Sequence, residues 1–278
     1  MTVAIAAKCW WSYQDHSSGW GLVAASERRL TTGDTHHSLP SMKGMGFGYR
    51  TWMLASGAIQ AHSHLGRLLL GSFPSLGAEG DETTCWQLAQ EYGELFKKYR
   101  QDRAESDVLT PLGYTTESFL DKMQNVPEAK AIEIMNRLED YRLDFEALFL
   151  GYDERREPCI LEVDSRGKVT NHESLGYGSI GSGSAHANAH MMFTGYKPIG
   201  NQFDAIWSVF CAKKRAEAAP GVGPETDLVW VNKNGVGAVD VRIVAKLEAI
   251  YARSRTAAEA QAKRAADALG ELADKLNI

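Results

Sequence analysis

The feature that most limits the fold is the order in which strand-like and helix-like stretches follow one another. Short runs of small and β-branched apolar residues, typical of strands, alternate with stretches whose apolar residues recur every three or four positions, typical of helices. The predicted strands span 3–7, 21–26, 49–56, 145–152, 158–163, 168–172, 227–232 and 237–241. The predicted helices span 58–70, 82–99, 129–143, 185–194, 202–219 and the alanine-rich stretch 242–278. The resulting order, ββ…αα…ββ…αα…ββ, predicts an α+β protein with two sheets between layers of helices.

The sequence shows no internal repeat and no low-complexity linker, so we expect a single domain over residues 1–278. A polar segment at about 101–127, which contains Pro111 and Gly113, is expected to be an insertion. The end of the chain, at about 242–278, is expected to be a helical extension with one apolar stripe. The aromatic stretch 9–20 is expected to form the long tip of a hairpin between the first two strands.

Composition excludes several classes of partner. A net charge of −5, without a long run of Lys or Arg, gives no support for nucleic-acid binding. No apolar run approaches the ~18–20 residues of a membrane span, and 3–7 is too short for a signal peptide. The four cysteines are widely spaced and form no CxxC pair, which favours reduced thiols and a cytoplasmic location.

The first residues of the chain carry a candidate nucleophile. A threonine hydroxyl reacts poorly near neutral pH, but a threonine at a free chain terminus has an α-amine beside its own oxygen. That amine titrates at about pH 7.7–8, so it can act as a base without a histidine. Met1 precedes the small residue Thr2, and methionine in that setting is expected to be removed. Thr2 is therefore expected to become the first residue.

Four landmarks stand in register behind this start. They are Glu27-Arg28-Arg29, Thr31-Thr32-Gly33, Lys43 and Ser56-Gly57, with ten residues from Gly33 to Lys43 and fourteen from Lys43 to Gly57. A Gly181-Ser182-Gly183 loop follows much later. Together these motifs resemble those of proteasome β-subunits and HslV-type peptidases, members of the N-terminal-nucleophile (Ntn) hydrolase superfamily. The segment Gly221-Val222-Gly223-Pro224 is similar to that of Anbu, a bacterial proteasome relative.

The resemblance implies a four-layer αββα sandwich of two antiparallel sheets between helix layers. It also implies a threonine-type endopeptidase whose nucleophile and base both belong to Thr2. Lys43 would stabilise the developing alkoxide, Glu27 would hold Lys43, and the backbone N–H of Gly57 would bind the oxyanion. Ser182 would bond to the Thr2 amine, and Arg29 would have a structural role.

Each role has a structural alternative that the residues leave open. Glu27 and Lys43 can form an ordinary exposed ion pair, which contributes little. Gly57 can serve only as a turn, and Ser182 only as a loop residue or helix cap.

Two departures from the family pattern widen the choice of function. The acid is glutamate instead of aspartate, which shifts the carboxylate by one methylene. Ala216 and Ala219 stand where proteasome β-subunits carry Asp and Ser, so two groups that orient the amine are missing. The alternatives are therefore a non-catalytic proteasome-like subunit for assembly or binding, or an Ntn amidohydrolase acting on a small amide.

The resemblance also implies a substrate pocket and partners. Pocket positions fall on Leu30, Ser41, Met45 and Ala55, which indicates a roomy, mostly apolar pocket. We expect a peptide or unfolded-protein substrate, a homo-oligomeric ring or spiral, and an ATPase unfoldase as a candidate partner. Ring size and the natural substrate are not specified by these residues.

No cofactor and no metal are expected. His186 and His190 have a spacing that can bind metal on a helix, but a zincin would carry a glutamate directly after His186. The remaining paired histidines are expected to be solvated. They are His36, His37, His62 and His64.

Overall fold

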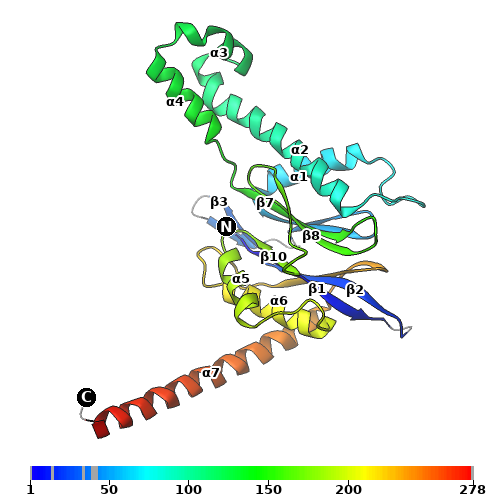
Figure 1. The fold of residues 1–278 in the computed structure, drawn as a ribbon, viewed down its shortest axis with the longest axis vertical. Coiled ribbons are helices and arrows are strands. Elements are labelled where there is room, and N and C mark those ends of the chain that lie inside the picture. The colour runs from blue at the N-terminus through cyan, green and yellow to red at the C-terminus, as the bar shows by residue number, and fades with distance from the viewer. Residues whose placement is uncertain (1, 14–15, 33–34, 39–42, 277–278) are drawn as a thin grey trace. The chain divides into compact units, whose positions relative to one another are not determined.

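A computed structural model describes residues 2–13, 16–32, 35–38 and 43–276 of the chain (Figure 1). The protein is of the α+β class, with two antiparallel five-stranded sheets. It divides into two compact units, Met1–Gly237 and Ala238–Ile278.

The first sheet has the strand order β10-β1-β2-β11-β12. Its strands are β1 (Ala4–Ser12), β2 (Ser18–Ser26), β10 (Tyr177–Ile180), β11 (Asp227–Asn232) and β12 (Gly235–Ala238). Strand β1 lies between β10 and β2, so the start of the chain enters the middle of the sheet. Because a strand in that place is buried on both sides, residues 3–7 are almost fully inaccessible.

Two predictions for this sheet were wrong. The stretch 9–20 is not mainly a loop, because β1 and β2 stay paired from Ala4 opposite Ser26 to Ser12 opposite Ser18. Aromatic residues suit a pleated surface, and the rings of Trp10 and Trp20 meet edge to face with centroids 5.0 Å apart. Strand β10 lies in the glycine-rich stretch where no strand was expected.

The second sheet has the order β5-β6-β7-β8-β9. Its strands are β5 (Gly44–Phe47), β6 (Thr51–Gly57), β7 (Phe145–Tyr152), β8 (Pro158–Val163) and β9 (Val169–Asn171). The bounds of β7 and β8 agree with the prediction. A separate two-stranded ribbon consists of β3 (Arg29–Thr32) and β4 (Thr35–Ser38).

The α-helices in the described residues are α1 (Ile59–Ser72), α2 (Cys85–Ala104), α3 (Thr116–Lys122), α4 (Glu128–Glu139), α5 (Ser184–Phe193), α6 (Gln202–Ala216) and α7 (Val241–Leu276). Six of them overlap the predicted helical stretches, with bounds that differ by up to five residues, whereas α3 lies where no helix was predicted. Helix α2 begins at a capping box, in which Thr84 and Gln87 satisfy each other's backbone N–H groups. The segment expected to be an insertion is helical in most of its length and shares a small core with α4. That core consists of Val108, Leu109, Phe119 and Ile134.

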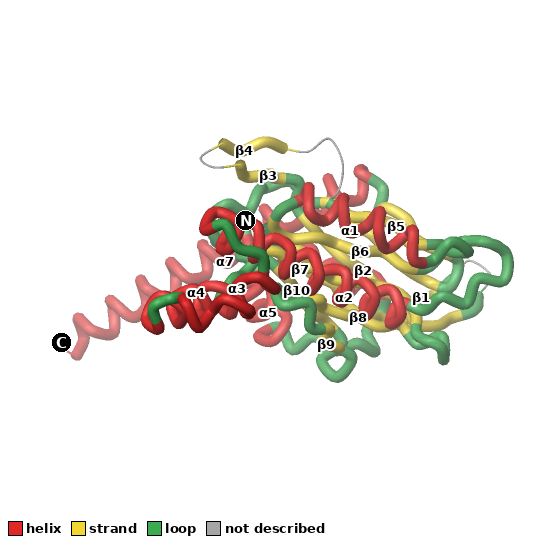
Figure 2. The backbone as a smooth tube through the Cα atoms, turned by 90° about the horizontal axis from the view of Figure 1, so that it is seen from above, coloured by secondary structure: helices red, strands yellow, loops and turns green. Residues whose placement is uncertain are grey.

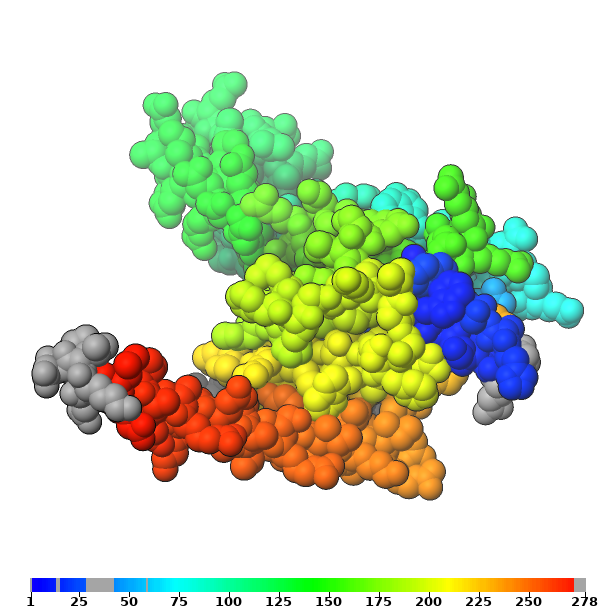
Figure 3. Space-filling view, turned by 60° about the horizontal axis from the view of Figure 1, so that its bottom comes forward, coloured from blue at the N-terminus to red at the C-terminus, as the bar shows by residue number. Residues whose placement is uncertain are grey.

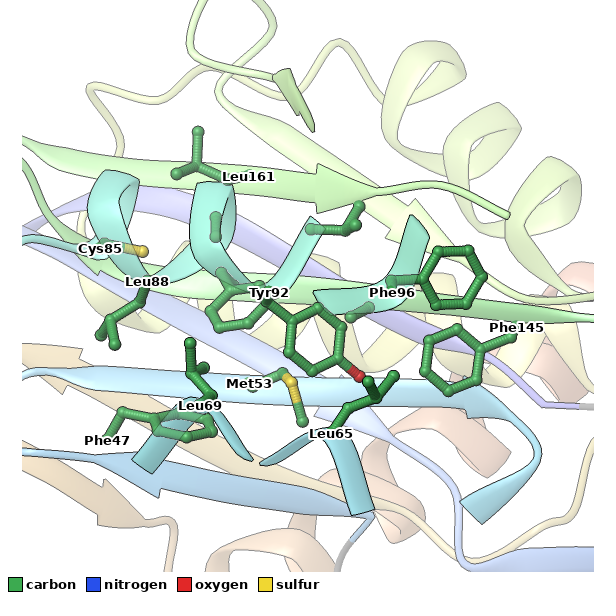
Figure 4. Close-up of a cluster of buried hydrophobic side chains, with 14 of the residues drawn as sticks. Phe47, Met53, Leu65, Leu69, Cys85, Leu88, Tyr92, Phe96, Phe145 and Leu161 are labelled. Atoms are coloured by element: carbon green, nitrogen blue, oxygen red, sulfur yellow. The ribbon is translucent and has the colours of Figure 1, made fainter. Parts of the chain in front are cut away.

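Two larger cores hold the first unit together. One lies between the sheets and combines residues from both, among them Ala6, Leu148 and Val229. The other lies between the second sheet and helices α1 and α2, and Figure 4 shows its aromatic part around Tyr92, Phe96 and Phe145. Helices α5 and α6 contact strand β1 of the first sheet and form the yellow and yellow-green surface in Figure 3. The layers, visible in Figure 2, are compatible with a sandwich of sheets and helices.

The second unit is essentially the single helix α7. In the described part of the chain, no helix combines the length and apolar character needed to cross a bilayer. The four cysteines are free and buried.

Candidate functional site

The hydroxyl of Thr2 lies at the centre of a buried polar cluster. Thr2 lies two residues before the start of β1 and is only 2% exposed. Its Oγ1 accepts a hydrogen bond of 3.1 Å from Nζ of Lys43 and donates one to Oε1 of Glu27. The structure thus brings together three residues that lie 25 and 41 positions apart in the sequence.

Glu27 and Lys43 form a buried ion pair. Glu27 follows the end of β2 and is 0% exposed, and Lys43 precedes β5 and is 7% exposed. Nζ of Lys43 lies 2.6 Å from Oε1 of Glu27. Charges removed from water need such a partner, because an isolated buried ion is strongly destabilising. The same Glu27 oxygen reaches both Lys43 and the Thr2 hydroxyl, so the longer acid bonds directly to the candidate nucleophile.

The loop 181–183 holds the backbone of Thr2. Oγ of Ser182 accepts from the backbone N–H of Thr2 at 3.2 Å and lies 3.3 Å from its carbonyl oxygen. The N–H of Gly183 donates to the same carbonyl at 3.2 Å. Gly181 has φ +88°, and a Cβ there would stand 2.4 Å from that oxygen, so only glycine fits.

Glu146 supports this loop and was not predicted from the sequence. Its Oε2 accepts a hydrogen bond of 2.7 Å from the backbone N–H of Gly181. Burial raises the pKa of Glu146 against the opposing effect of that N–H, and neighbouring carboxylates raise it further. Its position opposite Ser56 in the β6–β7 ladder depends on strand register. The available signal was a single charged residue inside the apolar run 145–152.

Gly57 ends β6 in a conformation that requires glycine. Its φ is +92°, and a Cβ there would stand 2.0 Å from the carbonyl oxygen of Asp144. The N–H of Ala55 donates to the carbonyl of Lys43 at 3.3 Å. Backbone N–H groups alternate in direction along a strand, so the N–H of Gly57 points to the same side as that of Ala55. A backbone donor therefore faces the side of β6 on which Lys43 lies.

The other predicted site residues are only partly described. Arg29 and Leu30 lie in β3, but their side chains are outside the described part of the structure, and Ser41 and Gly33 are outside it altogether. Met45 is half-buried in the core beneath α1, and Ala55 is buried within β6.

Two surface pockets, of about 320 and 300 Å³, lie elsewhere. Residues 73–87 line the first, and Trp86 with the turns around β8 lines the second. Neither is lined by Thr2, Met45 or Ala55.

The segment with the two unexpected alanines is apolar beside the chain start. Ala216 and Ala219 are buried, and Gly183 lies close against the Cβ atoms of Ala216 and Val3. One turn earlier, the ammonium of the fully buried Lys213 donates to Glu217 and to the carbonyl of Gly223. Burial lowers the pKa of Lys213 against the opposing effect of that ion pair. Gly183 is therefore flanked by the methyl group of Ala216 on one side and by Val3 of the chain start on the other.

The histidines differ from the prediction at one position. His62 is buried, not solvated, because it shares the inward stripe of α1 with Leu65 and Leu69. His64 and His186 are exposed, and the side chains of His36 and His37 are outside the described part. Within the described residues, no group of three or more His, Cys, Asp and Glu is arranged to hold a metal ion.

No protein-family model matches this chain, and a search of curated proteins finds no match either.

Proposed function

We propose that the protein is an N-terminal-threonine peptidase with a proteasome-like Ntn-hydrolase fold, and that Thr2 is its nucleophile. The single observation that carries the proposal is the Thr2 hydroxyl. It is buried and bonded at once to an ammonium, Lys43 Nζ at 3.1 Å, and to the carboxylate of Glu27. A hydroxyl with a purely structural role rarely bonds to two buried charged side chains. Buried charged groups cluster at functional sites, where they adjust the reactivity of a neighbouring group.

Cleavage of the Met1–Thr2 bond would supply the base. The freed α-amine would lie on the same residue as the hydroxyl and would take its proton as the oxygen attacks a substrate carbonyl. The nearby ammonium of Lys43 disfavours a second positive charge, so it favours the neutral, basic form of the amine. It also stabilises the alkoxide as it forms.

The surrounding backbone would complete the site. Ser182, which accepts from the Thr2 N–H at 3.2 Å, would hold the freed amine in place. The N–H of Gly57, on the Lys43 side of β6, would donate to the oxyanion of the tetrahedral intermediate. Glu27 would keep the Lys43 ammonium and the Thr2 hydroxyl in a fixed relative position.

The proposed substrates are peptides or unfolded polypeptides. A broad-specificity peptidase of this kind is safe in a cell only if its sites face an enclosed space, so we propose a homo-oligomeric ring or spiral in the cytoplasm. An ATPase unfoldase is the kind of partner that would feed such an assembly. An Ntn amidohydrolase acting on a small amide would use the same nucleophile.

A second candidate function is a non-catalytic subunit of such an assembly. The observation in its favour is the apolar contact of Ala216 with Gly183 beside the chain start, where the related peptidases carry polar groups that orient the amine. This candidate predicts that Met1 is retained and that Thr2 does not react.

Covalent labelling separates these functions. A peptide epoxyketone reacts with both the hydroxyl and the amine of an N-terminal threonine, so intact-mass measurement should show one inhibitor per chain. N-terminal sequencing should give Thr2 as the first residue. Thr2→Ala should abolish labelling and Thr2→Ser should retain it. An unlabelled protein with Met1 in place would refute the peptidase and favour the non-catalytic subunit. Turnover of small amides with no cleavage of peptides would favour the amidohydrolase.

A further inference from the structure

His62 is the most completely bonded histidine near the site, yet it does not contact Thr2. It is 3% exposed, on the inward face of α1. Its ring stacks on Phe145 with centroids 3.7 Å apart and planes inclined by 17°. Both ring nitrogens are bonded: Nε2 lies 2.8 Å from the carbonyl oxygen of Ser56, and Nδ1 lies 2.8 Å from the hydroxyl of Tyr92.

These partners fix the tautomer of the ring. Burial lowers the pKa of His62 to about 4, so the imidazole is neutral near pH 7. A carbonyl can only accept, so Nε2 carries the hydrogen and donates it to Ser56. Nδ1 then accepts from Tyr92, whose hydroxyl keeps its proton because burial raises its pKa.

The Ser56 carbonyl belongs to the same peptide group as the N–H of Gly57. In a trans peptide these two groups point in opposite directions. A hydrogen bond from His62 to the Ser56 carbonyl therefore also fixes the direction of the Gly57 N–H, which points away from His62. The alternation of N–H directions along β6 independently puts that N–H on the Lys43 side. Gly57 has no side chain to anchor this peptide, and its φ of +92° leaves the regular strand conformation.

We propose that His62 is a positioning residue for the oxyanion donor of Gly57. Its Nε2–H holds the Ser56–Gly57 peptide with the N–H directed at the Thr2 site, and it polarises the peptide so that this N–H becomes a stronger donor. The inference rests on the proposed function, since an oxyanion arises only if Thr2 attacks a carbonyl. Tyr92 extends the chain of hydrogen bonds by one link into the core.

Two inhibitors with the same leucine-rich peptide distinguish this role from a general structural one. An aldehyde accepts the Thr2 oxygen at its carbonyl carbon and becomes a hemiacetal, whose oxygen occupies the oxyanion position. A vinyl sulfone accepts the same oxygen at its β-carbon, and the proton ends on its α-carbon, so no carbonyl oxyanion forms. Loss of the oriented donor should therefore weaken the aldehyde selectively.

His62→Phe keeps an aromatic ring over Phe145 but has no N–H to donate. In the full chain we expect kcat for peptide hydrolysis to fall about 10- to 100-fold and aldehyde affinity to fall similarly, with KM nearly unchanged. The rate of vinyl sulfone labelling should stay within about threefold of wild type, because no oxyanion donor takes part in that step. Tyr92→Phe removes a single hydroxyl and should show the same selectivity with a smaller effect. His64→Phe, on the exposed side of the same helix, is the matched control and should behave as wild type.

The outcomes separate the two proposals. Wild-type protein that vinyl sulfone does not label would refute the proposed function. Labelled wild type with a folded His62→Phe variant that keeps both kcat and aldehyde affinity would refute the positioning role alone. Equal loss with both inhibitors would also refute it, because that pattern means a disturbed Thr2. If His62→Phe does not fold, Tyr92→Phe decides by the same comparison.

Discussion

Because His62 is buried, the stability of the protein should depend on pH in a way that can be calculated, whatever its function. The pKa of His62 is about 4 in the folded protein, against an ordinary value of 6.5 for an exposed histidine. Between these values the unfolded chain binds the proton and the folded protein does not. The free energy of unfolding therefore has its full value above pH 6.5 and falls as the pH decreases toward 4. From about pH 7.5 to about pH 5, this one residue should account for a loss of about 2 kcal/mol.

The test compares denaturant unfolding of the wild type and His62→Phe at both pH values, at fixed protein concentration. The variant is expected to be less stable at pH 7.5, because it leaves the Ser56 carbonyl and the Tyr92 hydroxyl without their buried partner. Its additional loss on acidification should be smaller than that of the wild type by about 2 kcal/mol. Equal acid sensitivity of the two proteins would show that His62 is accessible to protons in the folded state, and the tautomer argument would be wrong.

Three further predictions concern stability, and denaturant titration checks each. Glu27→Ala should cost about 3–5 kcal/mol, because it removes the carboxylate that balances the buried Lys43 ammonium, whereas Glu94→Ala, which breaks an exposed pair, should change stability by less than about 1 kcal/mol. Gly57→Ala should cost more than about 2 kcal/mol, since its Cβ would stand 2.0 Å from a backbone oxygen, whereas Gly71→Ala, with open space in a helix, should stabilise by about 0.5–1 kcal/mol. Thr84→Ala should cost about 1 kcal/mol through loss of the capping box.

Each of these predictions has an outcome that would contradict it. Similar effects of the two glutamate variants would mean that the Glu27 ion pair is solvated. A tolerated Gly57→Ala would mean that β6 does not end in the described conformation. An unchanged Thr84→Ala would mean that the start of α2 has another cap.

Local sequence patterns were sufficient to predict a strand or helix whose conformation is determined by its own residues. The strands 145–152, 158–163 and 227–232 have the predicted bounds, because each is an apolar run closed by turn-forming or polar residues. Strand β10 could not be found in this way, since Gly176–Gly183 gives no strand signal and the segment is extended only because β1 pairs with it. The length of the β1–β2 hairpin was underestimated for the same reason, because the pairing of its outer half depends on ring contacts between the two strands.

Some residues of the candidate site were likewise predictable from the sequence, and others were not. Thr2, Glu27 and Lys43 were selected because the motifs around them resemble, in type and spacing, those of a known family. Glu146 and His62 lie outside that pattern, and their relevance depends on partners in other strands and helices. A charged residue in an apolar run and a histidine in an apolar helical stripe are weak signals alone. The register of β6 against β7 places Glu146 opposite Ser56, and the hydrogen bond from Nε2 of His62 to the Ser56 carbonyl ties His62 to the same strand.

The contacts that hold β1 between β10 and β2 do not involve the peptide bond before Thr2. The ladder of β1 begins at Ala4, and the loop 181–183 binds the carbonyl of Thr2, so hydrolysis of the bond before Thr2 breaks none of these contacts. Under the proposed function, removal of Met1 would then act as a chemical trigger on a scaffold whose contacts around Thr2 are already formed. A precursor would keep the fold and gain its reactive amine afterwards.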